Sequence, residues 1–222
     1  MIVTFEKKYL RNLYEKGKAD DKKHRYQPEI VRKYKNCINL MRRVPDIISL
    51  AKYNGLNFEN LKGDKAGISS IRVNDQYRIE FTVTDNGVES VVSVCNILNC
   101  QTIINRSVMI TLKEIDPRMI ANNLIPFEPT HPGEILKDEI EYRGISQRKL
   151  ATKMGVAYSV LNEVLNAKRP VTAEYALLIE AALGIDAEPL VGMQADYNIQ
   201  VMRKNKSFAD RLVKISKVAA VF

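Results

Sequence analysis

Cysteine and histidine are scarce in this sequence, which limits the chemistry it can perform. Three cysteines, Cys37, Cys95 and Cys100, and two histidines occur in 222 residues. The cysteines are odd in number and lack the spacing of zinc ligands, so we expect reduced thiols and neither a metal site nor a cofactor. His24 lies in a charged loop and His131 directly precedes a predicted helix, so we expect neither histidine to act in catalysis.

Long apolar runs are also absent. No run approaches the roughly 20 residues that a helix needs to cross a bilayer. The first residues, "MIVTFEKKYLRNLYEKG", lack the apolar stretch of a signal peptide. The overall composition is that of a folded globular protein. We therefore expect a cytoplasmic protein without membrane contact.

Positive charge is concentrated in the first half of the chain. The net charge is +8. Residues 1–108 hold 19 lysines and arginines against 12 acidic residues, whereas residues 109–222 hold 15 against 14. This asymmetry favours a polyanion, such as a nucleic acid, as the partner of the first half. The alternative is an ordinary solvated basic surface.

The first half predicts an α+β domain. Apolar residues recur at helical spacing between Ile30 and Met41, which predicts a helix with one buried face. From about residue 56 the period becomes two, and "ISSIRVNDQYRIEFTVTDNGVESVVSVCNI" predicts three antiparallel strands. The turns are expected at 74–75 and at 85–87, where Asp-Asn-Gly is typical of a hairpin. Helices followed by such antiparallel strands indicate an α+β domain.

Strand alternation gathers cations on one face of the predicted sheet. Ile71, Val73 and the alternate residues from 77 to 83 point inward, which leaves Arg72 and Arg78 on the opposite, open face. The preceding segment brings Lys62 and Lys65 nearby. Four cations on one polar face suit phosphate binding. A solvated face with scattered ion pairs is the alternative.

The predicted boundary between the halves lies in a segment without long periodicity. We place a first domain at 1–100, a linker at 101–128 and a second, all-α domain at 129–222. Pro126, Pro129 and Pro132 lie around the end of the linker, and "VMITLKEIDPRM" resembles the opening of a separate protein that starts at Met109. The chain could therefore be a natural or an engineered fusion.

The second half predicts a helix-turn-helix. In "SQRKLATKMGVAYSVLNEVL", Ser146 is the expected N-cap and Gly155 the corner between two helices. Polar residues remain on the outward surface, where they can reach bases and phosphates in the major groove. The expected DNA contacts are Gln147, Arg148, Tyr158, Ser159, Asn162, Lys168 and Arg169. The alternative is an αα-hairpin packed in a core.

The C-terminal tail predicts an assembly surface. Its apolar stripe needs a partner, which is either the protein's own core or another protomer. The stripe consists of Phe208, Leu212, Ile215, Val218 and Phe222. Because the second half carries little net positive charge, a monomer should bind DNA weakly, and we expect a homodimer that reads two half-sites.

Two stretches resemble a known pair of families. "HPGEILKDEIEYRGISQRKLATKMGVAYSVLNEVLNAKRPVTAEYALLIEAALGI" resembles the HigA antitoxins, and "LKGDKAGISSIRVNDQYRIEF" resembles the HigB toxins of the RelE superfamily. The resemblance implies a toxin that cleaves messenger RNA on the ribosome, and an antitoxin that neutralises it and represses their operator. Lys62, Arg72 and Arg78 match the family's basic positions.

The chain departs from the HigB pattern at two places. Family members often carry a histidine where this chain has Glu59, and an Asp-Tyr-His ending near Asn96, Ile97 and Leu98. Glu59 is therefore the candidate base, and the ribosome could supply the missing groups. The acidic residues at 134, 138, 139 and 141 could face the basic surface in cis or across a dimer, or could be solvated.

Two functions follow from these patterns. The first is a toxin–antitoxin pair in one chain, with a latent endoribonuclease and an operator-binding repressor. The second is a transcriptional regulator whose RelE-like domain is catalytically inactive and binds a partner or ligand. The missing histidines favour the second function, and the basic sheet face favours the first.

Overall fold

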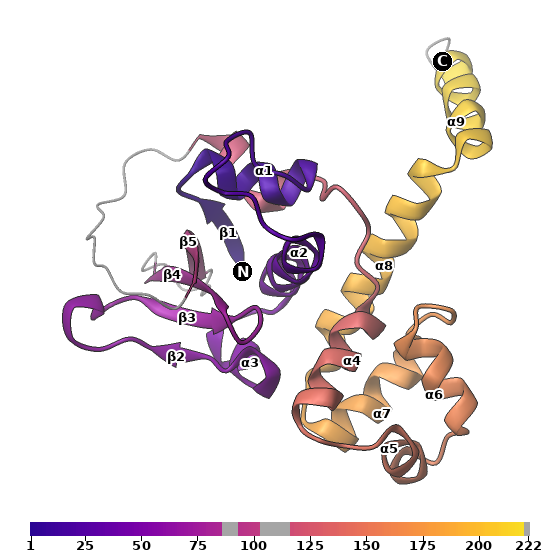
Figure 1. Cartoon of the computed structure of the whole chain (residues 1–222). Coiled ribbons are helices and arrows are strands. Elements are labelled where there is room, and N and C mark those ends of the chain that lie inside the picture. Colours follow the sequence, from indigo (N-terminus) through magenta and orange to yellow (C-terminus); the bar gives the residue numbers. More distant parts are fainter. Residues whose placement is uncertain (86–92, 103–115, 220–222) are drawn as a thin grey trace.

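The computed structural model describes residues 1–85, 93–102 and 116–219 (Figure 1). We refer to residues 1–127 as the N-terminal region and to residues 128–219 as the C-terminal region. The N-terminal region contains a sheet with helices on one face, and the C-terminal region is helical. The predicted fold class, α+β followed by an all-α helix-turn-helix domain, is confirmed.

The sheet has five strands in the order β1-β5-β4-β3-β2. The strands are β1 (Ile2–Phe5), β2 (Glu59–Asn60), β3 (Ser69–Arg72), β4 (Tyr77–Asp85) and β5 (Ser93–Thr102). The three predicted strands correspond to β3, β4 and β5, which pair antiparallel. The sequence did not indicate the pairing of β1, which runs parallel to β5. The predicted turn at 85–87 falls mostly outside the described residues.

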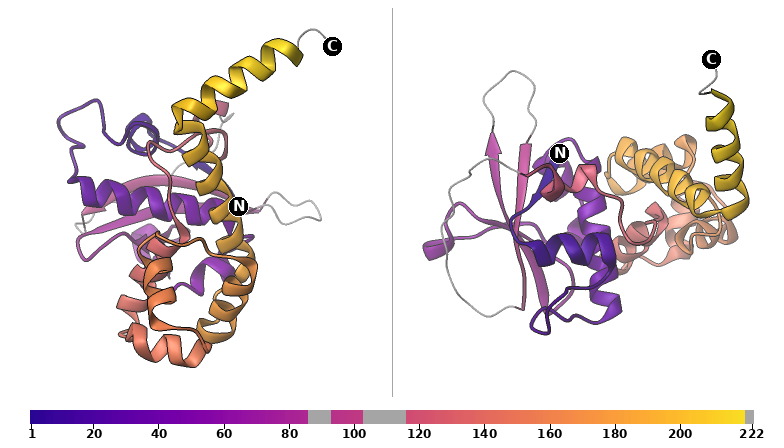
Figure 2. Two further views of the ribbon diagram at one scale, coloured as in Figure 1. Left: turned by 90° about the vertical axis from the view of Figure 1, so that its right-hand side faces the viewer. Right: turned by 90° about the horizontal axis from the view of Figure 1, so that it is seen from above.

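The helices of the N-terminal region cover one face of the sheet (Figure 2, right). They are α1 (Lys8–Lys16), α2 (Pro28–Arg43) and α3 (Ile47–Ala51), with 3₁₀ turns η1 (Asn54–Leu56) and η2 (Gly63–Lys65). Ile71, Ile79 and Phe81 are fully buried and belong to the core beneath these helices, as strand alternation predicted. The opposite face of the sheet points away from the C-terminal region.

Residues 117–127 complete the N-terminal region. They contain the 3₁₀ turns η3 (Pro117–Met119) and η4 (Ala121–Asn123). Asn122 accepts a hydrogen bond from Val3 N at 2.8 Å and donates to Met1 O at 3.1 Å, so this segment extends the β1 edge. Part of the predicted linker therefore packs against the first domain, and Gln101 and Thr102 belong to β5. Residues 103–115, which include Met109, lie outside the described residues.

The C-terminal region consists of six helices in the described residues. They are α4 (Pro132–Tyr142), α5 (Gln147–Met154), α6 (Tyr158–Leu165), α7 (Ala173–Leu183), α8 (Ala187–Lys204) and α9 (Lys206–Ala219). Helix α8 packs against α2 and α4 packs against η1, whereas α9 projects away from the other helices (Figures 1 and 2). Across the described residues, none of the helices has the length and apolar character of a membrane span.

Local capping determines where these helices begin and end. Ser146 accepts a hydrogen bond from Lys149 N as the N-cap of α5, and Gly155 ends that helix in the left-handed region at φ 67°. Glycine is favoured there because a Cβ strains the left-handed conformation. His131 is the N-cap of α4, so the expectation that it precedes a helix is confirmed.

Candidate nucleic-acid surfaces and the contact between the regions

The open face of the sheet holds a compact set of opposite charges. Arg72 and Arg78 face each other across β3 and β4, as the pleating argument predicted. The Arg78 guanidinium lies 3.1 Å from Glu59 Oε2, and its Nη1 donates to Ser70 Oγ at 3.3 Å. Glu59 also accepts from Asn57 Nδ2 at 2.6 Å. The candidate base and one candidate phosphate ligand are thus in direct contact.

The lysines of this face differ in their surroundings. Lys65 Nζ lies 2.7 Å from Glu80 Oε1, and both side chains are largely buried. Lys62, at the start of the 3₁₀ turn η2, is exposed. Among the predicted cations, Arg78 and Lys65 are therefore neutralised by neighbouring carboxylates, and a phosphate would have to compete with Glu59 and Glu80 for them.

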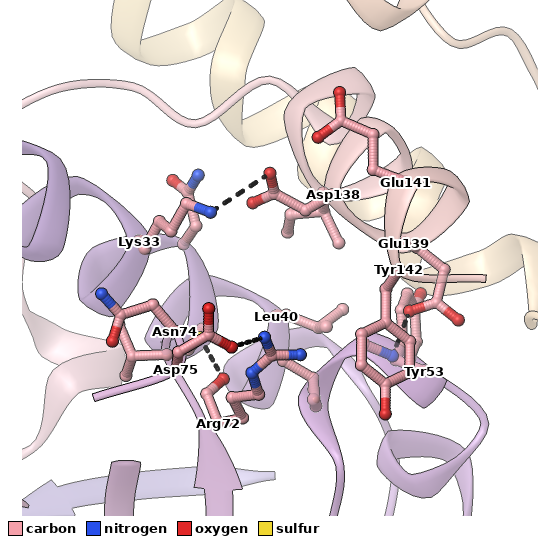
Figure 3. Close-up of a pocket in the computed structure, with 16 residues that line it drawn as sticks. Lys33, Leu40, Tyr53, Arg72, Asn74, Asp75, Asp138, Glu139, Glu141 and Tyr142 are labelled. Carbon is pink, nitrogen blue, oxygen red and sulfur yellow. Dashed lines mark hydrogen bonds and ion pairs between the residues drawn. The ribbon is translucent and has the colours of Figure 1, made fainter. Parts of the chain in front are cut away.

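Arg72 differs from the other three cations because it contacts the C-terminal region. Its guanidinium pairs with Asp75, and its Cζ lies 5.2 Å from the ring centroid of Tyr142 at the end of α4. β2 pairs with Ser69 and Ser70 but stops short of Arg72. The strand edge is therefore uncovered at Arg72, and the side chain is directed toward α4 (Figure 3).

The remaining candidates for acid–base chemistry lie elsewhere. His24 stacks on Tyr9 with ring centroids 3.7 Å apart, and its Nδ1 lies 2.7 Å from Asp21. His131 is buried, and its Nδ1 accepts from Gly133 N at 3.0 Å. Burial lowers the pKa of His131, with Glu134 acting in the opposite direction. Asn96, Ile97 and Leu98 lie in β5, and their side chains are outside the described residues.

The two regions meet through ion pairs of one polarity. In five pairs the cation belongs to the N-terminal region and the carboxylate to the C-terminal region. They are Arg32–Glu134 at 3.8 Å, Lys33–Asp138 at 3.7 Å, Lys35–Glu128 at 2.9 Å, Arg43–Asp196, and Lys52–Asp186 at 2.5 Å. Lys35 is buried, and burial lowers its pKa against the opposing effect of Glu128. Part of the positive charge of the first half is therefore neutralised by carboxylates of the C-terminal region.

Helix α4 makes a further buried contact with the N-terminal region. The Glu139 carboxylate, almost fully buried, accepts hydrogen bonds from Asn54 N at 2.8 Å and Gly55 N at 2.7 Å. Arg143 Nε donates to the same carboxylate at 2.5 Å. Arg143 also donates to Lys52 O at 2.9 Å and Leu183 O at 2.8 Å. The acidic residues of α4 thus face α2 and η1 in cis, and Glu134, Asp138 and Glu139 contact none of the four predicted phosphate ligands.

A cavity of about 270 Å³ lies between α2, α4 and the end of β3 (Figure 3). Lys33 and Arg72 contribute positive charge to its lining, and Asp138 and Asp75 contribute negative charge. Within residues 1–85, 93–102 and 116–219, no group of histidine, cysteine and carboxylate side chains could hold a metal ion.

Helices α5 and α6 lie on the side of the C-terminal region that is away from the sheet (Figure 1). Leu150, Ala151, Leu161 and Val164 are buried between the helices and fix their crossing. Asn162 Nδ2 donates to Gln147 Oε1 at 3.2 Å, and the Arg148 Cζ lies 5.5 Å from the Tyr158 ring centroid. Arg169 pairs with Glu163 at 2.8 Å, and Ser159 and Lys168 are exposed. The predicted DNA contacts of α5 and α6 therefore touch each other at two points.

Comparison with known proteins assigns the two regions. Residues 3–93 match the family model of the RelE-like toxin of type II toxin-antitoxin system HigB, and residues 136–190 match a helix-turn-helix model. Toxin HigB-1 of Vibrio cholerae serotype O1 is 35% identical over 92 residues, which cover 38% of this chain and 86% of that protein. The chain belongs to the HigB toxin family. It is a fused toxin–antitoxin protein, in which a HigB-type toxin precedes a helix-turn-helix DNA-binding domain.

Further similarities involve other bacterial proteins. Virulence-associated protein I of Dichelobacter nodosus is 32% identical over 87 residues, which cover 39% of this chain and 81% of that protein. A solved antidote protein of the HigA family from Coxiella burnetii is 30% identical, with 40% of this chain and 94% of that chain covered and a TM-score of 0.36. The Pseudomonas aeruginosa antitoxin HigA, solved with the higBA promoter, is 26% identical, with 40% and 91% covered and a TM-score of 0.34.

Sequence reasoning missed the most specific residues of the contact between the HigB-type toxin and the helix-turn-helix domain. Gly55 allows a close approach, because a Cβ on it would lie 2.9 Å from Glu139 Oε2. Within the C-terminal region, Gly133 allows α4 to approach α6 closely, because a Cβ there would lie 2.0 Å from Val164 O. Two signals were available: the cluster of acidic residues on α4, and the Glu139–Arg143 spacing of four residues, which is typical of a helical ion pair. Neither signal reveals the partner turn.

Proposed function

We propose that the chain is a latent messenger endoribonuclease that acts on the translating ribosome, and that its C-terminal region both neutralises it and represses its own operator. The Arg78–Glu59 contact carries this proposal, since it joins a phosphate ligand and a candidate base on a face that the C-terminal region leaves open. Membership of the HigB toxin family supports the same reaction class.

In the proposed reaction, Glu59 takes the proton of the RNA 2′-hydroxyl. The 2′-oxygen forms a bond to the adjacent phosphorus, and the bond between phosphorus and the 5′-oxygen breaks. The departing oxygen takes a proton from water or from a ribosomal group. Arg78 and Lys62 stabilise the negative charge that gathers on the phosphate oxygens, and they do so best when they are already in position before the reaction.

Operator binding is proposed for the surface along α5 and α6. We propose that Asn162 and Gln147 hydrogen-bond base edges and that Lys168 contacts a phosphate. Because α5 and α6 lie on the side away from the sheet, neutralisation and repression are compatible in one chain. We further propose that a second copy of the chain covers Phe208, Leu212 and Ile215 on α9, which are exposed in a single chain.

The test compares residues 1–127 with the full chain by primer extension on a messenger in a cell-free translation reaction. A fragment that ends at 127 is preferable to one that ends at 108, because Asn122 bonds the β1 edge and Ala121 is fully buried. Cuts made by the fragment and suppressed in the full chain support the proposal. A folded fragment that makes no cut contradicts it.

One alternative has an observation in its favour. Arg78 and Lys65 are each already paired with a carboxylate, and neither histidine of the chain lies on the open face of the sheet. A transcriptional regulator with an inactive RelE-like domain would show this arrangement. In the same experiment, a folded but silent fragment together with operator binding by the full chain would favour the regulator.

A further inference from the structure

We propose that α4 restrains the toxin directly and in cis, through Tyr142 on Arg72 and Glu139 on the turn η1. This inference rests on the nuclease function proposed above, because it assigns the regulation of that same site. The two contacts come from positions one turn apart on α4: Tyr142 reaches Arg72, one of the predicted phosphate ligands, and Glu139 reaches the turn η1 (Figure 3).

The contact at Arg72 competes with RNA for a phosphate ligand. The Tyr142 ring lies over the guanidinium at 5.2 Å, and Asp75 pairs with one of its nitrogens. The Asp75 side chain is almost fully exposed, so a phosphate could displace it. Tyr142 is the last residue of α4, so a movement of that helix would carry the ring away from Arg72. The negative face of an aromatic ring attracts a guanidinium, which biases the position of the Arg72 side chain toward Tyr142.

The contact at η1 holds α4 in place. Glu139 satisfies the backbone N–H groups of Asn54 and Gly55, which begin this turn. A buried carboxylate is costly unless it is fully hydrogen-bonded, and Arg143 supplies the third donor. Arg143 then reaches Lys52 O in the toxin and Leu183 O at the end of α7. The position of α4 is thereby tied to both regions at once.

Both contacts lie next to the predicted cleavage residues, one along the chain and one across the sheet. The turn η1 ends at Leu56, three residues before Glu59, and Arg72 faces Arg78 across the β3–β4 pair. A phosphate bound between Arg72 and Arg78 would require the Arg72 guanidinium to turn away from Tyr142. We infer that α4 keeps Arg72 from this position, while the rest of the open face stays uncovered.

The decisive experiment uses the full chain with Glu139→Gln and Tyr142→Ala combined, in the cell-free cleavage reaction. Tyr142 is 45% exposed, so its truncation leaves no large cavity. We expect messenger cleavage to rise at least tenfold over the unmodified chain. Adding Arg78→Ala to the double variant should abolish the new cuts. Operator binding by the double variant should be unchanged, which separates release of the toxin from unfolding.

Two matched variants test the chemistry of the restraint. Tyr142→Phe keeps the ring over Arg72 and should remain as silent as the unmodified chain. Glu141→Gln makes the same chemical change as Glu139→Gln two residues away, on an exposed part of α4, and should also remain silent. Release by either single variant would overturn the assignment of the restraint to these contacts.

The outcomes distinguish failure of this inference from failure of the proposed function. If residues 1–127 cut the messenger but the folded double variant does not, the restraint lies elsewhere and the inference is wrong. If neither cuts, the nuclease function fails and the inference fails with it. If the double variant cuts only when it has lost operator binding, the effect is unfolding, and the inference is likewise overturned.

Discussion

The two candidate nucleic-acid surfaces differ in how their charges are compensated. On the open face of the sheet, Arg78 and Lys65 are each matched by a carboxylate from the same region. On the helix-turn-helix, Ser159 and Lys168 are exposed, and Gln147 and Asn162 bond each other. The more basic region therefore has the more self-neutralised surface. Net charge indicated that a polyanion partner was plausible, but it did not indicate which cations are available to it.

The largest expected effect concerns Arg78 on the open face of the sheet. Arg78→Ala in residues 1–127 should slow messenger cleavage by about a hundredfold or more, as the loss of one preorganised donor to a developing anion does in other enzymes. Cleavage rates in the cell-free reaction measure the effect. Lys8→Ala removes the same charge from α1, on the other face of the sheet, and should change the rate by less than about twofold.

The second effect tests whether the weakly charged surface depends on a dimer. Leu212→Asp with Ile215→Asp places charge on the exposed apolar side of α9 and should yield a monomer in analytical ultracentrifugation. Operator affinity should fall by about a hundredfold, because two separate monomers no longer gain affinity from binding the two half-sites as one linked unit. Ser207→Asp, on exposed α9 surface beside the stripe, is the control. An unchanged sedimentation coefficient in the double variant would contradict dimerisation through α9.

The third effect separates base reading from phosphate contact on the helix-turn-helix. Asn162→Ala should weaken binding to the cognate operator by about 1–3 kcal/mol and relax selectivity at one base pair. Lys168→Ala should weaken binding to all sequences alike and reduce the salt dependence by about one unit of slope. Fluorescence anisotropy over a salt series measures both. Identical behaviour of the two variants would contradict the division of roles.

The smallest expected effect concerns the start of α4. Burial lowers the pKa of His131 below its usual 6.5, so the unfolded chain takes up a proton at a higher pH than the folded chain. The stabilisation is therefore complete above about pH 6.5 and declines as the pH falls through this value. Thermal unfolding between pH 7.5 and 5.5 measures the slope. His131→Asn retains an N-cap acceptor and should reduce the dependence of the unfolding temperature on pH. An equally steep dependence in the variant would rule out His131 as the group responsible.

Much of the fold could be predicted from the sequence because its signals are local. The period of two in β3 and β4 placed Ile71, Ile79 and Phe81 inside and Arg72 opposite Arg78. Ser146 and Gly155 marked the ends of α5 through their own hydrogen bonds and backbone preference. The parallel pairing of β1 with β5 could not be predicted, because four apolar residues do not specify a strand partner about ninety residues away.

The candidate sites also combine features that the local sequence predicts with features that depend on tertiary contacts. The sequence by itself determined the helix-turn-helix surface and the side of the sheet on which the cations lie, since both follow from the repeat of one helix or strand. Only the tertiary structure decided that Glu59 neutralises Arg78, that Tyr142 covers Arg72 and that Glu139 binds the turn at Gly55. Such contacts join residues that are far apart in the chain. They depend on how α4 docks against α2 and η1, which the periodicity of α4 alone does not specify.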